Sequence, residues 1–117
     1  MIKRRSDYSV KQNENMRGGE GVVVIEHLLT PEELYDKGRL YARLTLEPGC
    51  SIGYHVHEGE MESFFIVSGQ AEVSDNGELV LVSGGDTVLT RSGEGHSVKS
   101  VGADPLVMIA QILFASP

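Results

Sequence analysis

GCSIGYHVHEGEMESFFIVSG, residues 49–69, decides the fold, because it places two histidines at alternate positions between turn-forming residues. Residues i and i+2 of a β-strand project from the same face, so His55 and His57 point in one direction. The EGEM segment that follows turns the chain back, and Glu62 begins the next strand. If Glu62 pairs opposite His57, two imidazoles and one carboxylate face a common interior.

A third histidine, His96, lies downstream and completes a candidate set of metal ligands: His55, His57, Glu62 and His96. A lone His-x-His pair is more often a solvated strand face, but the added glutamate and histidine favour a metal site. Imidazole and carboxylate donors suit octahedral manganese, iron, nickel or cobalt, with two coordination positions left open. We predict one divalent transition metal per chain, with manganese or iron preferred and nickel, cobalt or zinc as alternatives.

Length and composition limit the other function classes. The chain has 117 residues, of which 40% are hydrophobic, and this is enough for one domain with a core. Its net charge of −7 and its lack of a basic stripe argue against nucleic-acid binding. It has one cysteine, no signal-peptide pattern and no apolar stretch long enough to span a bilayer. We therefore predict a cytoplasmic protein without membrane or nucleic-acid partners.

The N-terminal part shows little periodicity. Residues 1–21 are polar and glycine-rich at their end, which predicts an arm that is ordered only by packing on a partner. Residues 22–117 are expected to form a single domain. Within it, Thr30-Pro31-Glu32-Glu33 predicts a short helix ending near Gly38, with threonine as N-cap, proline at the first position and glutamate at the third.

From Leu40 onward the pattern is that of strands. Apolar residues alternate with polar ones over residues 40–46, and similar segments recur, separated by clusters of Gly, Asp, Asn and Ser, at 54–57, 62–67, 70–74, 78–82, 87–90, 96–101 and 106–114. Asp75-Asn76-Gly77 is typical of a tight hairpin turn, so the strands beside it should pair. This spacing predicts an all-β antiparallel sandwich or barrel with one short N-terminal helix.

The spacing also resembles a known family. Residues 49–69 read G-x5-H-x-H-x4-E-x6-G and match the first motif of the cupin superfamily at every fixed position. Its second motif, G-x5-P-x-G-x2-H-x3-N, is met by Gly85, Gly93 and His96, with Arg91 in place of proline and Ser100 in place of asparagine. The resemblance implies a jelly-roll β-barrel with a metal held inside by the four predicted ligands.

Short single-domain bacterial cupins of this kind resemble proteins described as oxalate-binding or oxalate-decarboxylase-like. The decarboxylating enzymes carry an arginine three residues before the first ligand histidine, where Ile52 stands here. This departure argues against decarboxylation and leaves binding of a small carboxylate, keto acid or sugar. A dioxygenase, a decarboxylase or an isomerase remains open as an enzyme activity, and the alternative is a non-catalytic binding or sensing module.

Four further residues are candidates for contacting the small-molecule ligand. Tyr41, Arg43 and Gln111 are polar residues within apolar strands, and Phe64 continues the inward face of the Glu62 strand. Alternation alone does not decide which face of the strand at residues 40–46 points into the core. Tyr41 and Arg43 could therefore face either the cavity or the solvent.

Other polar residues and the oligomeric state complete the expectations. Glu58 and Glu60, in the hairpin turn, are expected to point to water, and His27 is expected to be structural or exposed. The arm and the exposed strand edges of a jelly roll predict a homodimer.

Overall fold

The computed structural model describes residues 1–75 and 77–115, and these form ten strands and two short 3-10 turns. The elements are η1 (Arg5–Asp7), β1 (Ser9–Glu14), η2 (Met16–Gly18), β2 (Val22–Leu29), β3 (Gly38–Leu46), β4 (Ser51–Val56), β5 (Glu60–Ser68), β6 (Gln70–Asp75), β7 (Glu78–Ser83), β8 (Thr87–Thr90), β9 (Gly95–Ser100) and β10 (Leu106–Phe114).

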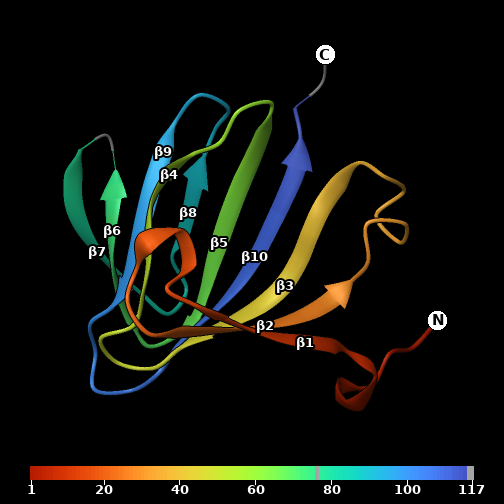
Figure 1. Ribbon diagram of the computed structural model, residues 1–117, viewed down its shortest axis with the longest axis horizontal. Coiled ribbons are helices and arrows are strands. Elements are labelled where there is room, and N and C mark those ends of the chain that lie inside the picture. The colour runs from red at the N-terminus through yellow and green to blue at the C-terminus, as the bar shows by residue number, and fades with distance from the viewer. Residues whose placement is uncertain (76, 116–117) are drawn as a thin grey trace.

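The strands form two antiparallel sheets that pack face to face. The larger sheet has the order β1-β2-β3-β10-β5-β8, and the smaller has the order β4-β9-β6-β7. In Figure 1 the smaller sheet lies on the left and the larger one extends to the right. The predicted pairing of residues 70–74 with 78–82 is confirmed by the β6–β7 hairpin, while Asn76 of the predicted turn lies outside the described residues. The all-β prediction is confirmed.

Alternation along β3 places one face of the larger sheet against the core. Ala42, Leu44 and Leu46 are buried between the sheets, so the intervening Tyr41 and Arg43 project from the opposite face. The inward residues of both sheets form one continuous core, which includes Ile52, Phe64, Ile66, Val73, Val98, Leu106 and Met108. The sequence left open which face of this strand points into the core, and the structure shows that it is the face with Ala42, Leu44 and Leu46.

The predicted helix near residues 31–38 is wrong. The expected capping box does form, since the Thr30 backbone N–H donates to Glu33 Oε1 at 2.9 Å and the Glu33 N–H donates to Thr30 Oγ1 at 3.1 Å. Tyr35 and Asp36 then adopt left-handed φ angles of 54° and 53°, which end the helical course after a single turn. The segment is a series of turns that leads into β3.

The N-terminal segment also differs from expectation. Residues 9–14 form β1, which pairs with β2 of the same chain, so a partner is not needed to order it. Arg5 in η1 reaches Glu26 on β2, and Glu26 in turn binds Arg43 on β3. The segment 1–21 is called the arm below; its separation from a domain of residues 22–117 stays a prediction.

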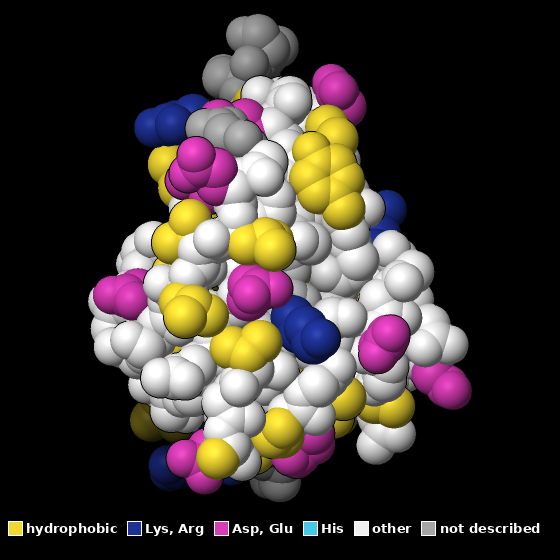
Figure 2. Space-filling view, turned by 90° about the vertical axis from the view of Figure 1, so that its left-hand side faces the viewer, with side chains coloured by type: hydrophobic (Ala, Val, Ile, Leu, Met, Phe, Trp, Pro, Cys, Tyr) yellow, Lys and Arg dark blue, Asp and Glu magenta, His cyan; other side chains and the backbone are white. Residues whose placement is uncertain are grey.

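The surface of the smaller sheet mixes apolar and charged side chains. Figure 2 shows this face with yellow apolar groups interspersed among acidic and basic ones. Among the residues that the structure describes, no histidine side chain is visible on this face (Figure 2). In the same part of the chain, no helix is long and apolar enough to cross a membrane.

Candidate metal centre

The four predicted ligands come from both sheets and meet between them. His55 on β4 is the cross-strand partner of His96 on β9, and His57 follows two residues later on the same face. Glu62 lies on β5 of the facing sheet, where its partners are Ile112 and Thr90. The expected pairing of Glu62 opposite His57 therefore does not occur within a sheet, and the two side chains meet across the sandwich instead.

The donor atoms converge on one point. His57 Nε2 lies 2.9 Å from Glu62 Oε1, and His96 Nε2 lies 3.0 Å from the same oxygen. His96 Nε2 is also 3.1 Å from the Nε2 atoms of both other histidines. Two donors that bind one ion at about 2.1 Å and at right angles lie about 3.0 Å apart. The donor set and its spacing fit a single octahedral transition-metal ion.

Each histidine is held by a partner on its other ring nitrogen. His55 Nδ1 lies 2.8 Å from the Gly53 carbonyl oxygen, and His57 Nδ1 lies 2.9 Å from Glu60 Oε1. His96 Nδ1 lies 2.8 Å from Thr90 Oγ1. A carbonyl and a carboxylate can only accept, so Nδ1 carries the proton in the first two histidines, and the Thr90 hydroxyl can accept in the same way. All three Nε2 lone pairs then face the centre, as metal-binding histidines require.

Electrostatics within the cluster favour a cation. Burial lowers the pKa of His55, whereas the hydrogen bond to Glu62 raises the pKa of His57. Burial acts to raise the pKa of Glu62, but its bonds to His57 and His96 outweigh this, and the pKa is lowered. These shifts favour a proton, and hence a positive charge, between the carboxylate and the imidazole of His57 in a buried space, and a metal ion would displace that proton and supply the positive charge instead.

Glu60 is a supporting residue that the sequence interpretation missed. It was expected to point to water, but it binds His57 and also accepts a two-pronged ion pair from Arg39, at 2.8 and 2.7 Å. The Arg39 bond, followed by the bond to His57, lowers the pKa of Glu60 to about 2. Glu60 follows His57 by three residues and begins β5, directly after the turn. This spacing is the feature of the sequence that could have suggested its role.

A cavity of about 250 Å³ adjoins the cluster. Its walls include three of the four candidate ligands, an apolar set from both sheets, and three residues of the arm. The lining residues are Lys11, Met16, Arg17, Ile25, His27, Arg39, Leu40, Leu44, Ile52, His55, His57, Glu62, Phe64 and Ile112. His27, which was expected to be structural or exposed, thus reaches this cavity. The arm was not expected to contribute to it at all.

The four predicted ligand-contact residues separate into two groups. Phe64 lines the cavity, and its ring stacks on His96 with centroids 5.1 Å apart and planes inclined by 13°. Tyr41 and Gln111 are cross-strand partners on the outer face of the larger sheet. Arg43, on the same face, binds Glu26 through two bonds of 2.8 and 3.0 Å. The structure brings Phe64 to the site and places the other three away from it.

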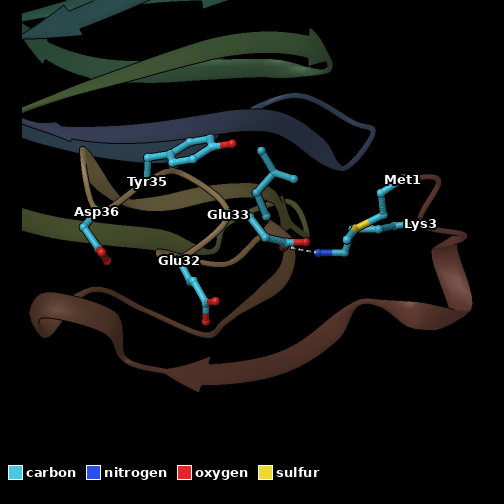
Figure 3. A pocket seen from close by; sticks show the side chains of 7 residues that line it. Met1, Lys3, Glu32, Glu33, Tyr35 and Asp36 are labelled. Atoms are coloured by element: carbon cyan, nitrogen blue, oxygen red, sulfur yellow. Dashed lines mark hydrogen bonds and ion pairs between the residues drawn. The ribbon is translucent and has the colours of Figure 1, made fainter.

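A second hollow, of about 660 Å³, lies at the surface between the start of the arm and the turns after β2 (Figure 3). Lys3 crosses it and forms an ion pair with Glu33 at 2.6 Å. Glu32 and Asp36 also line it (Figure 3). Within residues 1–75 and 77–115, the only convergent group of metal-ligand side chains is the histidine and glutamate cluster, so the smaller cavity is the candidate functional site.

Comparison with known proteins identifies the family. Residues 42–112 match the sequence profile of the cupin domain, and the chain belongs to the cupin family. It is 42% identical over 113 residues to a Thermotoga maritima protein named oxalate-binding protein, covering 97% of this chain and 93% of that one.

Solved structures agree with this assignment. A crystal structure described as a predicted oxalate decarboxylase from Thermotoga maritima superposes with a TM-score of 0.93 at 42% identity, covering 97% of this chain and 99% of that one. The polyketide cyclase RemF from Streptomyces resistomycificus superposes with a TM-score of 0.75 at 17% identity, covering 99% of this chain and 81% of that one, and shows the shared fold alone.

Proposed function

We propose that this protein holds one divalent transition-metal ion, manganese or iron in preference to nickel, cobalt or zinc, and binds a small carboxylate anion on it. The observation that carries the proposal is the convergence of three Nε2 atoms and one carboxylate oxygen, with every histidine fixed through Nδ1. Four protein ligands leave open positions for a ligand's oxygen atoms on a six-coordinate ion. A bound ion of this kind supplies a Lewis acid that polarises such oxygens.

Charge supports an anionic ligand. Lys11, Arg17 and Arg39 line the cavity, and Glu62, one of the candidate metal ligands, is the acidic residue among the described lining. A divalent ion with one carboxylate ligand adds a further net positive charge. The likeness to a protein named oxalate-binding protein suggests a small dicarboxylate, which the volume of about 250 Å³ accommodates.

The lining favours binding over turnover. A proton-transfer step needs an acid or base within hydrogen-bond reach of the ligand and not already committed. The one lining carboxylate faces the metal position, Glu60 is held by Arg39 and His57, and His27 is the remaining candidate at the wall. We therefore place a binding role first and a metal-dependent reaction second.

Titration calorimetry with oxalate tests the proposal. Protein loaded with manganese should bind oxalate at about one per chain, and the same protein treated with chelator should bind it far more weakly. Intact oxalate after hours of incubation, without oxygen uptake, supports a binding module, whereas loss of oxalate identifies an enzyme. Equal oxalate affinity with and without the metal would contradict the proposed site.

We also propose a homodimer. Phe65 and Val67 on β5 and Leu89 on β8 expose 46%, 48% and 43% of their surfaces on the outer face of the larger sheet. In addition, β1 is the outermost strand of that sheet, and all six of its residues are exposed. The apolar face near the β8 end of the sheet and the open strand edge at its β1 end are both kinds of surface that oligomers cover.

A further inference from the structure

From the contribution of the arm to the cavity, we infer that Arg17 recognises the anionic end of the ligand that binds at the metal. This inference rests on the proposed function, because it assigns the recognition of the same small carboxylate. The loop that carries η2 lies beside β4 (Figure 1). Arg17 is exposed and also lines the cavity, so this residue lies where the cavity meets solvent.

The other arginines near the site are already engaged. Arg39 also lines the cavity, but both of its bonding nitrogens are held by Glu60. Arg43 is bound by Glu26 on the outer sheet face. Across the described chain, Arg17 and Lys11 form no ion pair, so these two cations are available to a ligand. Of the two, a guanidinium matches a carboxylate through paired hydrogen bonds, whereas an ammonium offers a point charge.

Arg17 shares the cavity wall with the candidate metal ligands. It lines the same cavity of about 250 Å³ as His55, His57 and Glu62. The neighbouring strand β4 contributes Ile52 and His55 to the cavity wall. It therefore places no lysine or arginine there that would compete with Arg17 for an anionic ligand. An anion that bound the ion at one end would therefore meet the guanidinium of the arm at the other.

The backbone holds Arg17 in this place at a conformational cost. Asn15 and Arg17 have φ angles of 53° and 55°, the left-handed region that residues other than glycine seldom adopt. Such conformations persist only when the surroundings fix them, and they concentrate at functional sites. The surrounding contacts here are specific: Met16 packs against the core, and Glu20 N–H donates to Ser51 Oγ at 2.9 Å.

Two glycines allow the arm to approach β4 closely. A Cβ atom on Gly19 would clash with the Ser51 carbonyl oxygen, and one on Gly53 would clash with the Arg17 carbonyl oxygen. The contact between the two backbones therefore needs glycine on both sides. This close approach, together with the Ser51 N–H bond to the Glu20 carbonyl at 2.8 Å, fixes η2 against the strand that carries His55.

The test compares Arg17→Gln with the matched control Arg4→Gln, which removes an exposed arm arginine that does not line the cavity. For each manganese-loaded protein, the metal content per chain and the oxalate Kd are measured. Arg17→Gln should keep its metal and lose about tenfold or more in oxalate affinity, the loss expected for a charge-assisted pair of bonds. Arg4→Gln should stay within about twofold of wild type, since it makes no ligand contact.

A second variant, Gly19→Ala, changes none of the side chains that line the cavity but displaces η2, which carries Met16 and Arg17. It should also retain metal and bind oxalate more weakly, and Arg17→Lys should recover only part of the lost affinity. Wild-type affinity in metal-loaded Arg17→Gln would overturn the role of Arg17 while leaving the metal-and-anion proposal intact. Wild-type protein that holds metal but binds no oxalate would overturn both.

Discussion

Glu26 offers a quantitative test of how the arm is attached. This buried carboxylate is 6% exposed and accepts bonds from Arg43 at 2.8 and 3.0 Å and from Arg5 at 3.1 Å. The bonds of Arg43, opposed by burial and assisted by Arg5, lower its pKa from 4.5 to about 2. We expect Glu26→Gln to reduce the free energy of unfolding, because amide replacement leaves both guanidinium groups without their counter-charge.

The magnitude follows from the pKa. The fall of this pKa from 4.5 to about 2 corresponds to about 3 kcal/mol of interaction with the charged form. The Arg5 side chain is 74% exposed, and Arg43 is 26% exposed, so water screens part of this attraction. We therefore expect a loss of about 2 kcal/mol at neutral pH.

The sign of the pH dependence is fixed by the direction of the shift. A carboxyl whose pKa is depressed in the folded state stabilises the fold above its unfolded value and ceases to do so as the pH falls. The difference between wild type and Glu26→Gln should be constant above about pH 5 and should shrink between pH 4.5 and 2.

Urea unfolding of the metal-free proteins, followed by circular dichroism between pH 7 and 3, measures this difference. Glu47→Gln is the control, because Glu47 is exposed and has no ion pair within the described residues; it should change stability by less than about 0.5 kcal/mol. A Glu26→Gln loss below about 0.5 kcal/mol, or one that does not vary with pH, would refute the reasoning.

Three further predictions test the site and its surroundings. Glu60→Gln should weaken metal binding by about 10- to 100-fold, because it loosens the support of His57, and unchanged affinity in a metal titration would exclude that role. Gln111→Ala should leave the oxalate Kd of the manganese-loaded protein unchanged, since this side chain lies on the outer sheet face; a several-fold rise would reassign it to the site. Light scattering at low micromolar concentration should give twice the chain mass of 12.7 kDa, and a monomer would rule out the dimer.

The sequence predicted most of the strands and the shared face of His55 and His57 for a simple physical reason. Alternation of period two and the His-x-His spacing are local properties, and a strand converts them directly into shared faces. It could not predict the end of the turn at residues 35 and 36, because left-handed φ angles at Tyr35 and Asp36 are imposed by the connection into β3. The capping bonds between Thr30 and Glu33 form as the sequence predicted, but the helix that they were expected to begin does not form.

The remaining errors concern contacts between segments far apart in the chain. The role of Glu60 depends on Arg39, which reaches it from a different strand, and the arm contributes to the cavity only because two glycines let it approach β4. The positions of Tyr41 and Arg43 depend on which face of β3 is buried in the core. An alternating pattern defines the two faces of a strand but does not tell which one is buried. Long-range packing, rather than local propensity, decided each of these cases.

The central claim is that His55, His57, Glu62 and His96 hold one transition-metal ion. Elemental analysis of protein purified without chelator, beside His57→Ala prepared in the same way, tests it most directly. The account predicts close to one manganese or iron ion per wild-type chain and a sharp loss in the variant, since one of four ligands is removed. Equal metal content in the two proteins, or a wild-type chain that takes up no divalent transition metal, would contradict it.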